Sequence, residues 1–257
     1  MSRLVIGNLK MNIVSKVERN NYFKSFAGSI RNKKFSCTKI ILCPSIIHLE
    51  SFVSKIKNKN VSFGAQNIYY ENKGAYTGEN SPAMVKNFGG EYVIIGHSER
   101  RKYFGETNKD VNKKIKLALK EKLQPVFCLG EKLEERENGN LKKTIKEQLE
   151  LGLKNIPKNK LSKIIIAYEP IWSIGSGKMP TAEEVMEVQI LIKKILIDSF
   201  SLNIKKLPKI LYGGSVNYRN VEEVCIKSGM DGVLVGGESL HPVDFLKIVE
   251  IIDSENK

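Results

Sequence analysis

The chain is poor in the residues that build metal centres and disulfide frameworks. It has three histidines and four cysteines in 257 residues. The histidines are far apart in the sequence, and no two cysteines stand in C-x-x-C spacing, so clustered zinc ligands are not expected. A chain of this length needs no disulfides to stabilise its fold. We therefore expect no metal site, and free, mostly buried thiols at Cys37, Cys43, Cys128 and Cys225.

Long hydrophobic runs are also missing. No apolar stretch approaches the roughly 20 residues that a membrane-spanning helix needs. The first residues, MSRLVIGNLK, contain no long apolar segment of the kind found in signal peptides. We therefore expect a cytoplasmic protein without membrane association. Hydrophobic residues still make up 41% of the chain and charged residues 27%, a balance typical of globular domains.

Acidic residues are outnumbered, at 28 Asp and Glu against 42 Lys and Arg, which gives a formal net charge of +14. A strongly basic chain suggests a nucleic-acid-binding protein. The lysines, however, are spread along the whole sequence rather than gathered in one block. We therefore do not expect nucleic-acid binding. The same positive field would favour the capture of a small dianionic substrate.

Short, continuous apolar runs recur along the chain and alternate with longer helical patterns. Continuous runs are typical of parallel strands that are buried on both faces. There are eight of them: Leu4–Gly7, Lys39–Cys43, Val61–Ala65, Tyr92–Ile95, Pro125–Cys128, Lys163–Tyr168, Lys209–Tyr212 and Gly232–Val235.

The segments between these runs have helical periodicity. In Glu183–Phe200, apolar residues recur at three- and four-residue steps, and Thr181 with Glu184 resembles a capping box. Asn108–Lys122 and Leu141–Leu153 show similar patterns. Eight strands that alternate with helices, and no linker, predict an α/β fold: a single (β/α)₈ barrel domain over residues 1–257.

In such a barrel, the active site lies at the carboxyl ends of the strands. Polar and glycine residues follow five of the runs there: Asn8 and Lys10 after the first, His97 and Glu99 after the fourth, Glu169 after the sixth, Gly213–Ser215 after the seventh, and Gly236 and Gly237 after the eighth. We expect these residues to share one site.

Glu169 ends an apolar run, where a carboxylate is costly unless it is paired or functional. A partly desolvated carboxylate is a stronger base, but a structural glutamate fits this position equally well. His97 could transfer protons near neutral pH or could simply be hydrogen-bonded at a strand end. Adjacent glycines expose N–H groups that bind phosphate, or they form turns. The Gly-rich segment Ile174–Lys178 fits a lid over a substrate.

Several motifs together resemble the triosephosphate isomerase family. They span nearly the whole chain in that family's order: GNLKMN at Gly7–Asn12, IIGHSERR at Ile94–Arg101, AYEPIWSIGSGK at Ala167–Lys178, YGGSV at Tyr212–Val216 and VGGESL at Val235–Leu240. GAQN at Gly64–Asn67 and GAYTGE at Gly74–Glu79 resemble the segment through which that family dimerises.

The resemblance implies a reaction: interconversion of dihydroxyacetone phosphate and glyceraldehyde 3-phosphate, without a cofactor. It implies Glu169 as the base, a neutral His97 as electrophile and proton shuttle, as in the general account of this family, and Lys10 with Asn8 as stabilisers of the enediolate. It further implies phosphate binding by Gly175, Ser215, Gly236 and Gly237, a supporting role for Glu99, and a homodimer formed through residues 66–80.

The sequence departs from the family's pattern at a few positions. Leu9 replaces an aromatic residue, and Ser173 and Ser176 replace Ala and Thr. Glu238 stands where the family has a small residue, directly after the phosphate-binding glycines. A carboxylate there would repel a bound phosphate. We expect the Glu238 side chain to face solvent or to pair with a lysine.

Three other functions are considered. A sugar-phosphate epimerase would have metal-ligand histidines and acids, which are missing. An aldolase would use Lys10 as a Schiff base. A basic barrel without isomerase activity could bind phosphate or nucleic acid as a module, although the presence of Lys10, His97 and Glu169 argues against it.

Overall fold

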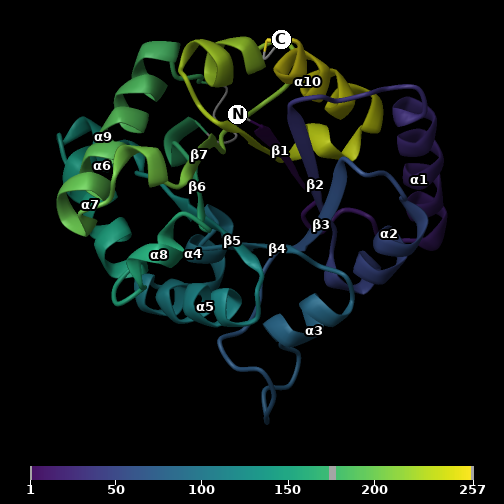
Figure 1. The fold of residues 1–257 in the computed structure, drawn as a ribbon, viewed down its shortest axis with the longest axis horizontal. Helices are drawn as coiled ribbons and strands as arrows, with labels where there is room; N and C mark the ends of the chain where they lie inside the picture. The colour runs from purple at the N-terminus through teal and green to yellow at the C-terminus, as the bar shows by residue number, and fades with distance from the viewer. Residues whose placement is uncertain (1, 174–177, 256–257) are drawn as a thin grey trace.

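The computed structural model describes residues 2–173 and 178–255. Parallel strands form a closed barrel in sequence order, from β1 to β8, and helices surround it (Figure 1). The strands are β1 (Arg3–Asn8), β2 (Thr38–Cys43), β3 (Val61–Ala65), β4 (Tyr92–Ile95), β5 (Gln124–Leu129), β6 (Ile165–Tyr168), β7 (Lys209–Tyr212) and β8 (Gly232–Val235). The predicted (β/α)₈ barrel is confirmed.

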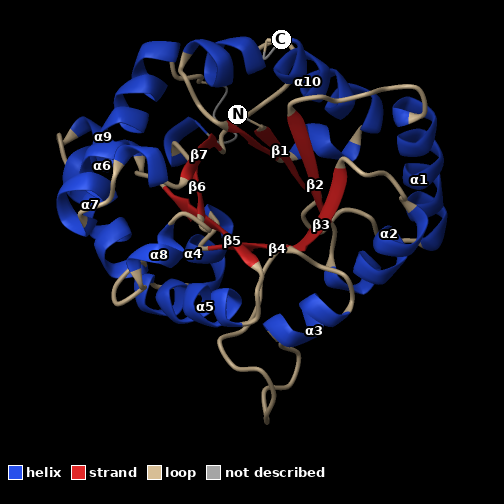
Figure 2. Cartoon of the chain, in the orientation of Figure 1, coloured by secondary structure: helices blue, strands red, loops and turns tan. Residues whose placement is uncertain are grey.

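The helices form an outer ring around the strands (Figure 2). They are α1 (Lys16–Ile30), α2 (Leu49–Lys55), α3 (Pro82–Asn87), α4 (Ser98–Phe104), α5 (Asn108–Lys120), α6 (Leu133–Glu137), α7 (Leu141–Gly152), α8 (Lys158–Leu161), α9 (Ala182–Phe200) and α10 (Pro242–Ser254). The capping box at the start of α9 is present: the Glu184 N–H donates to Thr181 Oγ1, and the Thr181 N–H donates to Glu184 Oε2.

The predicted boundaries differ from the structure at a few ends. The sixth strand begins at Ile165 rather than Lys163, because the N–H groups of Lys163 and Ile164 close the turn after α8. The helix predicted over Asn108–Lys122 ends at Lys120, since Lys122 has a left-handed φ of 60°. Leu153 caps α7 instead of extending it.

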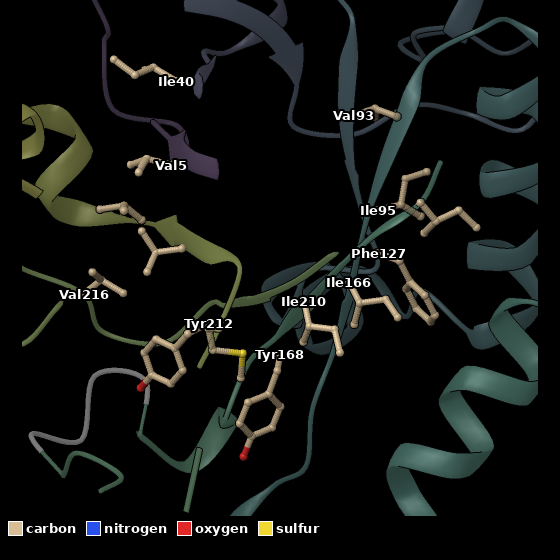
Figure 3. Packing of buried hydrophobic residues seen from close by; sticks show 14 of the residues in the cluster. Val5, Ile40, Val93, Ile95, Phe127, Ile166, Tyr168, Ile210, Tyr212 and Val216 are labelled. Atoms are coloured by element: carbon tan, nitrogen blue, oxygen red, sulfur yellow. The ribbon is translucent and has the colours of Figure 1, made fainter. Parts of the chain in front are cut away.

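The strands separate two apolar layers, which explains why their sequences are apolar without interruption. Side chains such as Leu4 and Ile6 pack inside the barrel. Val5, on the opposite face of the same strand, packs toward the helices, as do Ile166 and Ile210 (Figure 3). Alternate side chains of one strand therefore enter different layers, both of which are buried from solvent. Cys43, Cys128 and Cys225 are buried and Cys37 is half-buried, and none of the four takes part in a disulfide within the described residues.

The barrel closes where β1 pairs with β8, with Leu4 opposite Gly232 and Gly7 opposite Val235. One connection stands apart from the ring: the segment between β3 and α3 extends away from it, at the bottom of the view (Figure 1). Among the described residues, no helix is long and apolar enough to span a membrane.

Candidate active site

Glu169 lies directly after β6, at the carboxyl end of the barrel, and is only 1% exposed. Its Oε2 accepts a hydrogen bond of 2.9 Å from the backbone N–H of Ser98. Its Oε1 has no hydrogen-bond partner among the described residues and lies 3.4 Å from Nε2 of His97. A buried acceptor without a donor is costly. The carboxylate is therefore anchored by one oxygen, and the other is available to accept a proton.

Two glycines make room for this side chain. A Cβ at Gly130 would lie 1.7 Å from the carbonyl oxygen of Glu169, and one at Gly213 would lie 2.9 Å from its Cγ. No larger residue fits at Gly130, because the clash is with backbone atoms. The glycines after β5 and β7 thus allow Glu169 to sit between neighbouring strand ends.

His97 follows β4 and caps α4. The backbone N–H of Glu99 donates to Nδ1 of His97 at 3.2 Å. Because Nδ1 accepts a hydrogen bond there, the proton of a neutral ring is on Nε2, which faces Glu169 and the cavity. The helix start therefore selects one tautomer of His97 and makes Nε2 a hydrogen-bond donor.

The turn that carries His97 is held by charged groups beneath it. The Gly96 N–H donates to Oε2 of Glu106 at 2.9 Å, and the Gly96 carbonyl accepts from Nε of Arg101 at 2.8 Å. Glu106 is buried and also bonds to Lys114, a buried cation. Burial lowers the pKa of Arg101, although the Glu106 carboxylate opposes that shift. Both peptide groups of Gly96 are therefore fixed by side chains.

Lys10 has an unusual backbone, with a left-handed φ of 50°. Its carbonyl accepts hydrogen bonds from Gln66 Nε2 at 2.8 Å and Ser45 Oγ at 3.1 Å. Its N–H donates to Oδ1 of Asn8 at 3.1 Å. Left-handed geometry costs energy in a residue with a Cβ, and these three bonds offset that cost. They direct the side chain of Lys10 over the mouth of the barrel.

The ammonium group of Lys10 is paired with Glu99, with Nζ 2.5 Å from Oε1. A carboxylate in contact with the ammonium group favours an electrostatic role for Lys10 over a Schiff base, because a nucleophilic amine must be neutral.

Six of the residues predicted for the site line one cavity of about 260 Å³ at the mouth of the barrel: Asn8, Lys10, His97, Ser215, Gly236 and Gly237. Gly236 precedes a short 3₁₀ turn, η5 (Gly237–Leu240), and Gly237 is its first residue. Ser239 in this turn donates to the carbonyl oxygens of Gly236 and Asn8 and so joins the ends of β8 and β1. Backbone N–H groups at such a turn favour an anion.

Glu99 and Glu169 are not among the residues that line this cavity; Glu169 lies beside His97, which does line it. Glu99 lines an adjoining hollow with Lys10 and His97. Gly175, with residues 174–177 of the predicted lid segment, lies outside the described residues.

The expectation that Glu238 faces solvent or pairs with a lysine stays a prediction. Its side chain is half-buried and lines the same cavity as Gly236 and Gly237. Across residues 2–173 and 178–255, no basic side chain forms an ion pair with it. Glu238 is the second residue of η5.

The sequence reasoning missed Glu131, which is fully buried after β5. Its Oε1 accepts hydrogen bonds from Trp172 Nε1 at 2.8 Å and the Tyr168 hydroxyl at 3.0 Å. Burial raises the pKa of Glu131, and these hydrogen bonds oppose the shift. Its place two residues beyond a strand end was the available signal. Glu131 fixes the chain that follows Glu169.

Within the part of the chain that the structure describes, no three His, Cys, Asp or Glu side chains are grouped closely enough to hold a metal ion.

Comparison with known proteins identifies the family of this chain. The family model for triosephosphate isomerase matches residues 3–252. A triosephosphate isomerase from Dictyoglomus turgidum is 42% identical over 247 residues, covering 96% of this chain and 98% of the relative. One from Endomicrobium trichonymphae is 43% identical over 247 residues, covering 96% and 97%. One from a Clostridium botulinum strain is 41% identical over 246 residues, covering 96% and 98%. The chain belongs to the triosephosphate isomerase family.

Proposed function

We propose that Glu169, His97 and Lys10 carry out the triosephosphate isomerase reaction of this chain, the interconversion of dihydroxyacetone phosphate and D-glyceraldehyde 3-phosphate. The observation that carries the proposal is the Glu169 carboxylate, which is buried and anchored through one oxygen, with its other oxygen beside His97. A base in that state removes a carbon-bound proton efficiently, because it is poorly solvated and already oriented.

His97 and Lys10 act on the substrate oxygens. With its proton on Nε2, a neutral His97 donates a hydrogen bond to the carbonyl, which favours removal of the neighbouring proton, and it then moves protons between the two oxygens. The ammonium group of Lys10 stabilises the negative charge of the enediolate, and Asn8 adds a polar contact on the same side. Glu99 positions Lys10 through the ion pair.

The phosphate binds against Ser215, Gly236 and Gly237, and against Gly175. Binding of the phosphate group supports the chemistry in two ways. It holds the reacting carbons at a fixed distance from Glu169, and it uses binding energy from a part of the substrate that does not react. The alternative of a barrel module without isomerase activity is not favoured, because the family assignment covers nearly the whole chain.

The active form is a homodimer in the cytoplasm. The extended segment 66–80 supports this proposal, together with a hollow of about 450 Å³ beside Lys10 that includes Met11 and Phe104. Met11 is 88% exposed. Ile46 also lines the hollow, and the residue after it, Ile47, is 80% exposed. In the dimer, the tip of one subunit near Thr77 reaches the other subunit beside Lys10 and covers these apolar groups.

A coupled assay with glyceraldehyde 3-phosphate tests the reaction and the base together. Glu169→Asp shortens the side chain by one methylene and so moves the carboxylate away from the substrate. We expect kcat to fall by about a hundredfold. The matched control, Glu187→Asp, shortens an exposed carboxylate of α9 and leaves kcat unchanged. An inactive wild-type protein with a normal melting transition would refute the proposed reaction. A fully active Glu169→Asp variant would refute the assignment of the base.

A further inference from the structure

The cavity proposed to hold phosphate contains a carboxylate. Glu238 lines it together with Gly236, Gly237 and Ser215, which are the residues assigned to the phosphate. The cavity has a volume of about 260 Å³, and a sphere of that volume is roughly 8 Å across, which is no more than one Debye length at physiological salt. Any anion in the cavity therefore lies within the electrostatic range of Glu238.

No neighbouring cation forms an ion pair with this carboxylate within residues 2–173 and 178–255. Two lysines are close enough to matter. Lys10 lines the same cavity but is paired with Glu99. Lys247, on α10, pairs with Asp244 at 2.8 Å. The hydrogen bond that Lys247 donates to Asp244 raises the pKa of Lys247, and the negative charge of Glu238 adds to that shift. The two cations are thus held by other carboxylates.

We propose that Glu238 is a specificity-determining residue that makes the phosphate subsite discriminate by ligand charge. The inference rests on the proposed function, since it takes this cavity as the site of the phosphate group. The backbone N–H groups around Gly236 and Gly237 attract an anion, and the Glu238 carboxylate repels it in proportion to its charge. A phosphate monoester dianion is repelled less than a ligand with three or four negative charges.

The positive charge of the whole chain explains why the negative charge of Glu238 affects the binding of anions. A net charge of +14 draws every small anion toward the protein, whether it is substrate, inorganic phosphate or a more highly charged phosphate compound. Without a local negative charge, the most highly charged ligands would bind best. Glu238 reverses that order at the subsite itself. It also weakens the binding of the product, which shares the substrate's phosphate group.

Titration calorimetry with inorganic phosphate and with pyrophosphate tests this directly on the full chain. Four proteins are compared: wild type, Glu238→Gln, Glu238→Ala and the control Glu147→Gln, which removes an exposed carboxylate of α7 and changes the net charge equally. We expect both Glu238 variants to bind phosphate roughly three- to tenfold more tightly than wild type, and pyrophosphate to gain more than phosphate. The gain shrinks as salt is raised, and the control equals wild type.

Unchanged or weaker phosphate binding in both Glu238 variants overturns the inference, as does an equal gain in Glu147→Gln or a gain that is the same for both ligands. Absence of phosphate binding in all four proteins also overturns it. If one Glu238 variant does not fold, the other provides the same comparison. Because binding is measured without turnover, an inactive protein whose Glu238 variants still gain affinity would refute the isomerase proposal alone.

Discussion

Oε1 of Glu169 lies 3.4 Å from Nε2 of His97, while its other oxygen accepts a hydrogen bond from the N–H of Ser98, the residue after His97. One turn therefore fixes both side chains. The peptide that begins α4 anchors the carboxylate, and the same helix start holds the His97 ring through the Glu99 N–H. The same turn holds both the proposed base and the proposed electrophile, so a few backbone atoms set the distance between the two side chains.

Replacement of His97 by Gln keeps a hydrogen-bond donor near the carbonyl but removes the proton shuttle. General acid–base catalysis contributes about 10²- to 10⁴-fold, so we expect kcat of His97→Gln to fall by about that amount, with a much smaller change in KM. Steady-state kinetics in both directions measures this. A KM that rises as much as kcat falls would instead assign His97 to substrate binding.

Three of the four thiols should be inert in the native protein. Burial raises the pKa of Cys43 and Cys128, and raises that of Cys225 to about 12, so almost no thiolate forms at pH 8. We expect iodoacetamide to label half-buried Cys37 faster than the other three by about two orders of magnitude or more, because they react only after local opening. Peptide mass spectrometry over time measures the rates, with urea-unfolded protein as the control in which all four react. Rapid native labelling of Cys128 would contradict the prediction.

Tyr212, beside the cavity, should make stability depend on pH in alkali. Burial raises its pKa from 10.0 to about 12. The folded state therefore keeps the phenolic proton after the unfolded state has lost it. This contribution to stability is complete below pH 10 and is lost as the pH rises toward 12, by up to about 1.4 kcal/mol per pH unit.

The Tyr212→Phe variant has no phenol to titrate. Between pH 9 and 11, we expect its free energy of unfolding to fall by about 1 kcal/mol less than that of wild type. Tyr22 and Tyr168, whose pKa values burial also raises, titrate in both proteins, so the difference isolates Tyr212. Urea denaturation at several pH values measures this difference. The same pH dependence of the free energy of unfolding in both proteins would show that Tyr212 is hydrated.

The proposed dimer predicts that Ile47→Glu is monomeric, because the new carboxylate would be buried at the interface without a partner. Light scattering after size exclusion should give twice the chain mass of 29.0 kDa for wild type and a single chain mass for the variant. Ile190→Glu, a similar change at a 56% exposed residue of α9, should remain dimeric. Identical masses for the three proteins would exclude this surface as the interface.

The sequence allowed the strands to be predicted well, because a strand buried on both faces has little freedom in its residues. Val61–Ala65 and Tyr92–Ile95 were located to the residue. Ends set by single turns were harder, as at Lys122, whose left-handed φ stops a helix that its side-chain pattern would continue.

Parts of the site could not be predicted from sequence for a different reason. Strand-end residues such as Lys10 and Ser215 were found by their place in the chain, and the structure brings them to one cavity. The contacts that hold them join distant residues through backbone atoms, such as Glu169 with Ser98 or Gln66 with Lys10. Backbone donors and acceptors leave no mark in a residue pattern.

The pairing of β1 with β8 has a consequence for synthesis on the ribosome. Arg3–Asn8 leaves the exit tunnel early, but one of its two partner strands is made only after most of the chain. At about 5 to 20 residues per second, that wait lasts roughly tens of seconds. During this time the nascent chain exposes an unpaired apolar strand edge, the kind of surface that chaperones bind. Barrel closure is thus the last event that the order of translation permits.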